Sequence, residues 1–205
     1  MIKIAILGTE SSGKTTLATG IAAYFGVDFV KEFAREYLEN FYQNQQKNQQ
    51  ERQQESQQEN YQKQPYSLQD IENIAKQQYQ NIQNNYQNSI KNNIQQNKKP
   101  QKLLITDTEL IVTKIWAQNS FKTVPKWILE HIEKQNFDLY LLTSADDIAW
   151  EYDPLREHQD INDRKMLFEC YKNELEKYKF SYEIISGESK EFRLKKALES
   201  IKKLL

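Results

Sequence analysis

The stretch that decides the fold spans residues 8–15 and reads Gly8-Thr9-Glu10-Ser11-Ser12-Gly13-Lys14-Thr15. The two glycines allow backbone angles that a side chain would block, so consecutive N–H groups can turn inward around phosphates. Lys14 can place its charge on the β- and γ-phosphates, and the Thr15 hydroxyl is suited to ligating Mg²⁺. The pattern G-x-x-x-x-G-K-[ST] therefore predicts a loop that binds a nucleoside triphosphate, with Thr16 as the next contact.

The flanks of this loop have the order that such a site requires. Residues 2–7 form a short apolar, β-branched run that is typical of a buried parallel strand. Residues 16–25 carry apolar side chains at helical spacing, so the phosphates would meet a helix N-terminus. A chance match in an ordinary turn would not explain this strand–loop–helix order.

Composition restricts the class of protein. The 205 residues carry a net charge of −1, which implies no general attraction to nucleic acid or to an anionic membrane. Mean hydropathy is −0.87, and no apolar run approaches the roughly 20 residues of a membrane span. Cys170 is the one cysteine, which excludes an internal disulfide. We expect one cytoplasmic domain over residues 1–205 with a small-molecule substrate; the oligomeric state is not predicted.

Apolar strand candidates alternate with helical stretches along the chain. Such alternation implies parallel pairing with right-handed crossovers, so we expect an α/β fold with a five-stranded parallel sheet. With a phosphate loop after the first strand, this arrangement fits a P-loop NTPase of the small-kinase type, like that of nucleoside kinases. Ligands should gather outside the carboxyl ends of the strands. The five predicted strands are residues 3–8, 28–31, 102–107, 138–143 and 181–187.

Residues 43–64 differ in kind from the rest of the chain. They are dominated by Gln and Asn with almost no apolar residue, so they cannot bury enough surface to fold against a core. Two interpretations stay open: a disordered insertion, or a solvated extension of the helix that begins near Phe33. From Ser67, a plausible N-cap, to Gln96, an apolar stripe at helical spacing predicts a long helix packed on the core.

Two acidic residues and one arginine are candidates for the chemistry. Asp107 ends the third predicted strand, where a carboxylate can hold Mg²⁺ or can cap the following helix. Glu32 follows the second strand and could accept a proton from a substrate hydroxyl, or could simply start a helix. Arg35 lies on the same helical face and could bind substrate or pair with Glu32.

The segment after the fourth strand contains Arg156 and Arg164, about two helical turns apart. Small phosphotransferases use such an arginine-bearing lid to neutralise charge on the transferred phosphoryl group and to exclude water. Surface ion pairs are the alternative interpretation of these arginines. Trp116, Trp150 and Tyr152 could stack on a flat, cationic ring, although ordinary core or lid packing is the better explanation of any one of them taken alone.

Together these segments resemble the ribosylnicotinamide kinase domain of the bifunctional bacterial NAD-biosynthesis protein. The resemblance spans nearly the whole chain apart from residues 43–64, and its less generic parts are Glu-x-x-Arg-Glu-Tyr and Asp-Pro-Leu-Arg. The matching stretches are Gly8–Thr15, Phe29–Leu38, Asp107–Glu109 leading to Lys114–Trp116, Asp138–Leu142 and Asp153–Arg156.

The resemblance implies ATP-dependent phosphorylation of the 5′-hydroxyl of nicotinamide riboside. It implies roles for Glu32 as base, for Asp107 at Mg²⁺ and for Lys14, Arg156 and Arg164 on the phosphates. It also implies substrate contacts from Gln78, Trp116 and Tyr152, beside Arg35. Gly187 and Arg193 would lie next to the adenine ring.

The chain departs from the family in two ways. No adenylyltransferase domain is present in these 205 residues, so the resemblance concerns the kinase half alone, and Glu109 stands where the family often has Asp. A kinase of another small alcohol, such as a nucleoside or thiamine, is the alternative within enzymes. A nucleotide-switch ATPase with a protein partner is the alternative of another class. The sequence lacks an obvious second acidic strand end that would activate water.

Overall fold

The computed structural model describes residues 1–52, 66–95, 103–146, 148, 160–187 and 189–205. Its centre is a five-stranded sheet in the order β2-β3-β1-β4-β5, in which every pairing is parallel. The predicted α/β class and all five predicted strands are confirmed, with bounds that differ by one or two residues. The strands are β1 (Ile2–Gly8), β2 (Phe29–Val30), β3 (Leu103–Asp107), β4 (Leu139–Thr143) and β5 (Tyr182–Ile185).

Helices cover both faces of the sheet, which is why its central strands are mostly apolar. Alternate residues of β1 enter opposite cores: Ala5 and Leu7 pack with one group of helices, and Ile4 and Ile6 with the other. The core of Ile4 and Ile6 contains α1 (Lys14–Phe25) and α7 (Lys190–Lys202). The core of Ala5 and Leu7 contains α3 (Leu68–Gln95), α4 (Leu110–Phe121), α5 (Lys126–His131) and α6 (Ile161–Lys177).

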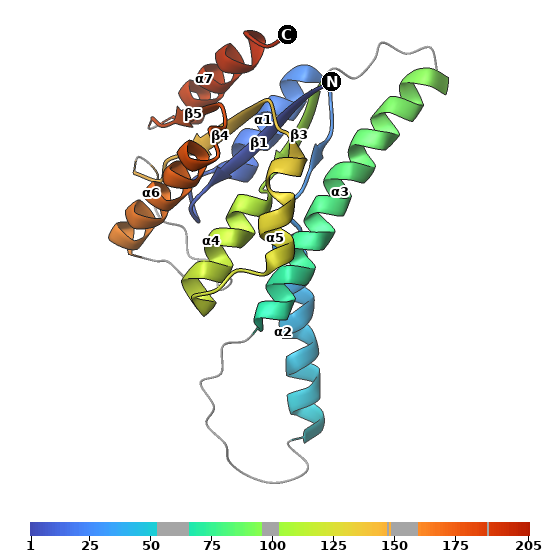
Figure 1. The fold of residues 1–205 in the computed structure, drawn as a ribbon, viewed down its shortest axis with the longest axis vertical. Helices are drawn as coiled ribbons and strands as arrows, with labels where there is room; N and C mark the ends of the chain where they lie inside the picture. The colour runs from blue at the N-terminus through green and yellow to red at the C-terminus, as the bar shows by residue number, and fades with distance from the viewer. Residues whose placement is uncertain (53–65, 96–102, 147, 149–159, 188) are drawn as a thin grey trace.

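Helix α2 (Phe33–Arg52) includes the beginning of the Gln/Asn-rich tract. The first ten residues of the tract continue this helix, as the helix propensity of Gln, Glu, Lys and Arg allows. Residues 53–64 of the tract lie outside the described residues. In Figure 1 the end of α2 points away from the sheet, so this part of the helix extends beyond the layered core.

Helix α3 forms where the apolar stripe predicts it. Ile71, Ile74 and Ile82 are almost fully buried, and Tyr79 and Tyr86 pack partly buried against the same core. The predicted cap at Ser67 is also present. The Asp70 backbone N–H donates to Ser67 Oγ (3.2 Å), and the Ser67 N–H donates to Asp70 Oδ2 (2.7 Å), which satisfies two donors at the helix start.

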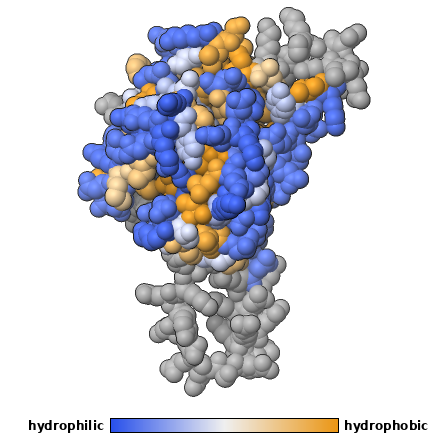
Figure 2. Space-filling model, in the orientation of Figure 1, coloured by the Kyte–Doolittle hydropathy of each residue, from blue (hydrophilic) through white to orange (hydrophobic). Residues whose placement is uncertain are grey.

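A short 3₁₀ helix, Glu133–Gln135, joins α5 to β4. In the described parts of the chain, no helix combines the length and the apolar character needed to cross a membrane. Figure 2 shows hydrophilic side chains over most of the visible face, with hydrophobic residues in smaller areas between them.

Asp70 provides a test of how α2 and α3 are joined, because Tyr37 of α2 donates its hydroxyl to Asp70 Oδ1 (2.5 Å). Partial burial raises the pKa of Asp70, but hydrogen bonds from Ser67 and Tyr37 outweigh it and hold the pKa below its ordinary value. A lowered folded pKa stabilises the protein above the unfolded pKa, and this stabilisation is lost as pH falls through the folded pKa. We expect Asp70→Asn to lower the free energy of unfolding at pH 7, and the difference from wild type to shrink below about pH 4.

The measurement is urea unfolding at several pH values between 7 and 3. Asp28→Asn is the control, since Asp28 is an exposed carboxylate on another part of the surface. A difference for Asp70→Asn that stays constant with pH would contradict the assigned hydrogen bonds.

Candidate active site

A cavity of about 500 Å³ opens at the carboxyl ends of the strands, where parallel α/β proteins place their ligands. The register explains its position, because Gly8 pairs with Thr143 and Ile6 pairs with Asp107, so these strands end together. The predicted ATP loop, Glu32, Arg35, Gln78 and Trp116 all line this one cavity. Its lining also includes Thr108, Val112, Ile115 and Asn119 around α4, Leu167 and Tyr171 from α6, and Leu194 from α7.

The loop has the backbone shape that a phosphate site needs. Gly8 and Gly13 have φ values of 147° and 79°, and Ser11 also lies in the left-handed region at 54°. The Ser12 hydroxyl donates to the Thr9 carbonyl (2.7 Å) and lies 2.6 Å from Thr143 Oγ1, which anchors the loop to the end of β4. Lys14 Nζ donates to the Thr9 carbonyl (2.9 Å), so its ammonium lies within the curve of the loop.

Thr15 and Asp107 meet at the base of the cleft. The Thr15 hydroxyl donates to Asp107 Oδ2 (2.5 Å), and the buried Oδ1 of Asp107 has no hydrogen-bond partner among the described residues. Desolvation raises the pKa of Asp107, although Lys14 and the Thr15 hydrogen bond oppose this. A hydroxyl beside a carboxylate with an unused oxygen fits Mg²⁺, which takes one or two protein oxygens and nucleotide phosphates.

The described residues contain no group of three or more acidic, His or Cys side chains that could hold a metal ion. A Mg²⁺ ion that arrives with a nucleotide does not need such a group, because phosphates and waters complete its shell.

Asp107 does not cap the following helix, which was the alternative interpretation of this residue. Helix α4 begins at Leu110, and Glu109 is its N-cap, since a Glu109 carboxylate oxygen accepts from the Ile111 N–H (2.9 Å). The reason is the backbone between them, because Thr108 adopts a φ of 70° and turns the chain before the helix starts. Asp107 is therefore left facing Thr15.

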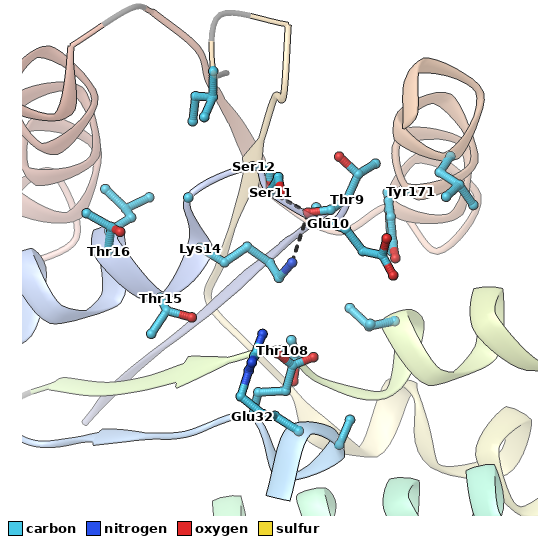
Figure 3. A pocket seen from close by; sticks show the side chains of 18 of the residues that line it. Thr9, Glu10, Ser11, Ser12, Lys14, Thr15, Thr16, Glu32, Thr108 and Tyr171 are labelled. Atoms are coloured by element: carbon cyan, nitrogen blue, oxygen red, sulfur yellow. Dashed lines mark hydrogen bonds between the residues drawn. The ribbon is translucent and has the colours of Figure 1, made fainter. Parts of the chain in front are cut away.

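Glu32 lies between β2 and α2 on the opposite side of the cavity from the loop. Figure 3 shows its side chain and Lys14 extending into the same space from opposite sides. Desolvation raises the pKa of Glu32, and the nearby charge of Asp107 adds to the rise while Lys14 opposes it. Arg35 lines the cavity one helical turn further on, with Nη1 3.9 Å from Glu39 Oε1.

Trp116 lines the cavity from α4 and packs edge to face on Tyr66, with ring centroids 4.9 Å apart. Its indole N–H donates to the Tyr66 hydroxyl (2.8 Å), which fixes the plane of the ring at the cavity wall. Tyr66 is buried and was not singled out from the sequence, because it lies two residues after the end of the Gln/Asn-rich tract and belongs to no apolar repeat.

The predicted lid falls mostly outside the described residues. Arg156 and Tyr152 lie there, as does Trp150. Arg164 lies in the first turn of α6, where it is 4% exposed. It is not one of the residues that line the cavity, whereas Leu167 and Tyr171, one and two turns later, do line it. Roles for the two arginines at the phosphates stay predictions.

Arg193 lines the cavity but directs its guanidinium at the backbone. It donates to the carbonyls of Ser12 (2.7 Å), Ile185 (3.1 Å) and Ser144, and thereby joins the phosphate loop to the ends of β4 and β5. Gly187 has a φ of 122°, and a Cβ there would lie 2.6 Å from the Phe192 ring. An adenine contact by either residue stays a prediction.

The comparisons with known proteins agree with this architecture. A family model described as an AAA domain matches residues 3–193. The chain belongs to the AAA domain family. A search of curated proteins found no match to this AAA domain.

Solved structures share its fold. A NadR protein in complex with NR matches with a TM-score of 0.62 at 22% identity, and NadR in complex with NAD and AMP-PNP gives 0.62 at 21%. These matches cover 98% of this chain but 51% and 49% of the NadR chains, so the chain spans about half their length. Deoxyadenosine kinase from M. mycoides with bound dCTP matches over 98% of this chain and 100% of its own, with a TM-score of 0.55 at 14% identity.

Two buried residues received no assigned role from the sequence, one in the cavity wall and one directly after Thr108. Tyr171 is buried in the cavity wall, and its only sequence signal is helical spacing with Leu167 and Leu175. Glu109 is fully buried, and desolvation raises its pKa to about 7. Gln135, 26 residues away, donates to its carboxylate (2.9 Å), a pairing that no local pattern indicates.

Gly8→Ala tests the shape of the loop in this AAA domain. An added Cβ would lie 2.4 Å from Thr143 Oγ1 and 2.5 Å from the Thr143 carbonyl, so the loop must move away from β4. We expect nucleotide affinity to fall at least about tenfold, since the phosphate-binding N–H groups move with it. Titration with a fluorescent ATP analogue measures this.

Gly26→Ala is the matched control. Gly26 also has a positive φ, of 66°, but no atom lies within 4 Å of its added Cβ. It should lower the free energy of unfolding by about 1 kcal/mol and leave nucleotide affinity unchanged. Equal nucleotide affinity in both variants would show that the close approach of Gly8 to Thr143 is not needed for binding.

Proposed function

We propose that this chain is an ATP-dependent small-molecule kinase and that its preferred acceptor is nicotinamide riboside. The observation that carries the proposal is the position of Glu32, which lies across a single cavity from Lys14 and from the Thr15–Asp107 pair. A carboxylate at that place faces the end of a bound triphosphate. It can accept a proton from an attacking hydroxyl.

The proposed reaction is a direct phosphoryl transfer. The acceptor hydroxyl oxygen bonds to the γ-phosphorus of ATP, the bond from that phosphorus to the β,γ-bridging oxygen breaks, and ADP leaves. The hydroxyl proton passes to the Glu32 carboxylate, whose raised pKa makes it a stronger base than an ordinary glutamate. Lys14 and the N–H groups of the loop hold the phosphates in line.

Thr15 and Asp107 are the residues that would hold Mg²⁺ in this site. The ion supplies positive charge to the β- and γ-phosphate oxygens when it is bound.

The acidic and aromatic side chains that line the cavity favour a cationic substrate. Glu10 and Glu32 both line the cavity, and each acts on the buried Tyr171 closely enough to raise its pKa, after desolvation, the larger cause. The aromatic rings of Tyr171 and Trp116 add faces that attract a cation. Nicotinamide riboside carries its positive charge on a flat pyridinium ring, and the fold is shared with a NadR protein in complex with NR.

A neutral nucleoside is the second candidate acceptor, because deoxyadenosine kinase from M. mycoides shares the fold over its whole length. Thiamine is a third, since it also carries a cationic ring. The alternative of another class is a nucleotide-switch ATPase, in which the γ-phosphate orders a surface for a protein partner. In all of these alternatives residues 1–205 act as one domain, and residues 43–64 are an insertion that the chemistry does not use.

An acceptor panel separates these possibilities. Purified protein with ATP and Mg²⁺ is given nicotinamide riboside, thiamine or common nucleosides, and ADP release is measured. We expect nicotinamide riboside to give the highest kcat/KM. If no small alcohol changes the rate of ADP release and a protein partner raises it, the kinase proposal is wrong and the chain is a switch ATPase.

Glu32→Gln tests the proposed base. Removing the carboxylate should lower kcat by about 10²- to 10⁴-fold, the usual contribution of a general base, with ATP affinity unchanged. Glu36→Gln is the control, because Glu36 is an exposed carboxylate one turn further along α2. Glu32→Gln at wild-type turnover would remove the assigned role.

A further inference from the structure

The side-chain amide of Gln78 connects two parts of the proposed site, the start of α2 directly after Glu32 and the end of β3 at Asp107. Gln78 lies on α3 and is 2% exposed. Its Oε1 accepts from the backbone N–H of Phe33 (2.8 Å), the residue directly after Glu32. Its Nε2 lies 3.2 Å from Thr106 Oγ1 and 3.4 Å from each of the Asp107 and Thr108 carbonyl oxygens.

The orientation of this amide follows from its partners. The Phe33 N–H can only donate, so it requires the amide oxygen, and the two carbonyls can only accept, so they require the NH₂ group. Its two N–H groups are shared among three protein oxygens. Gln78 therefore directs its donors at the protein even though it lines the cavity.

The turn that Gln78 contacts is under strain. Thr108 has a φ of 70°, which is unfavourable for a β-branched side chain. Three contacts hold it there: its N–H donates to the Ile6 carbonyl (2.9 Å), its carbonyl accepts from Thr106 Oγ1 (2.8 Å), and Gln78 Nε2 approaches the same carbonyl. Strained backbone persists at functional sites when the surroundings fix it in this way.

Backbone pairing alone does not fix Glu32 relative to Asp107. Strand β2 pairs with β3 at Phe29 and Val30, so the ladder ends two residues before Glu32. Gln78 continues the link beyond that point, from Phe33 to the residues around Asp107. Without it, the start of α2 loses this hydrogen-bonded link to the end of β3.

We propose that Gln78 is a positioning residue for phosphoryl transfer, which holds Glu32 in register with Asp107 and does not bind the substrate. This inference rests on the proposed kinase function. Gln78 acts through Glu32, so its loss should change turnover and not the binding of either substrate.

The test compares Gln78→Met with Gln77→Met. Methionine keeps the length of the side chain and removes both polar ends. Gln77 is the matched control, since its amide donates to Asn81 one turn along the same helix (2.8 Å). We expect Gln78→Met to lower kcat by about 10- to 100-fold, the effect of a misplaced reacting group. KM for the acceptor and affinity for ATP should stay within about twofold of wild type.

Three kinetic results would overturn the proposal. A raised acceptor KM at unchanged kcat would make Gln78 a substrate ligand. Equal kinetics for Gln78→Met and Gln77→Met would leave it without a role. If Gln78→Met does not fold, Thr106→Val replaces it, because valine has the same shape but cannot bridge Gln78 to Thr108. Thr106→Val should also lower kcat at constant KM, and wild-type kcat would be the third contrary result.

Hydrogen exchange at the Phe33 amide separates this inference from the proposed function. Gln78→Met should speed exchange there about fivefold or more relative to Gln77→Met, the effect of losing one hydrogen bond. Unchanged exchange would overturn the bridge itself. Wild-type protein that phosphorylates no acceptor would instead overturn the kinase function.

Discussion

The parallel register of β1 with its two neighbours is the constraint on which the rest of the site depends. Because Ile6 pairs with Asp107 and Gly8 pairs with Thr143, three strands end at one edge of the sheet. The phosphate loop leaves β1 at this edge, and the Thr15 hydroxyl reaches Asp107 Oδ2. A shift of one residue in either pairing would turn the side chain of Asp107 or Thr143 to the other face.

Burial of charge shapes the chemistry at this edge. Desolvation raises the pKa values of Glu32 and Asp107, and Lys14 opposes the rise at both carboxylates. The ammonium therefore stabilises the two charged acids that the proposed reaction needs, until the phosphates of a nucleotide compete for it. Interactions among these groups are stronger than at the surface because water is partly excluded from the cavity.

Local sequence patterns predicted those parts of the fold that depend on a few neighbouring residues. The loop, the five strands and the buried stripe of α3 each follow from glycine geometry or apolar spacing over a few residues. Contacts between distant segments had no such signal. Arg193 binds carbonyls at residues 12, 144 and 185, and Glu109 meets Gln135, because the folded sheet brings these segments together.

The sequence also left two roles open for Asp107, as a Mg²⁺ ligand or as the cap of the following helix. In the structure Glu109 caps α4, and Asp107 at the end of β3 faces Thr15. The positive φ of Thr108 decides the matter by turning the chain between them. Roles at the substrate for Arg35, Trp116 and the lid arginines stay predictions, since they depend on ligands bound in the cavity.

In the proposed function, the γ-phosphoryl group of ATP passes directly to a hydroxyl of a cationic nucleoside. The most direct measurement uses ATP labelled with ¹⁸O in the γ-phosphoryl group, in unlabelled water with nicotinamide riboside and Mg²⁺, followed by mass spectrometry of the products. We expect the labelled phosphoryl group in a phosphate ester of the nucleoside. Label that is found in free phosphate while the nucleoside stays unmodified would contradict the account.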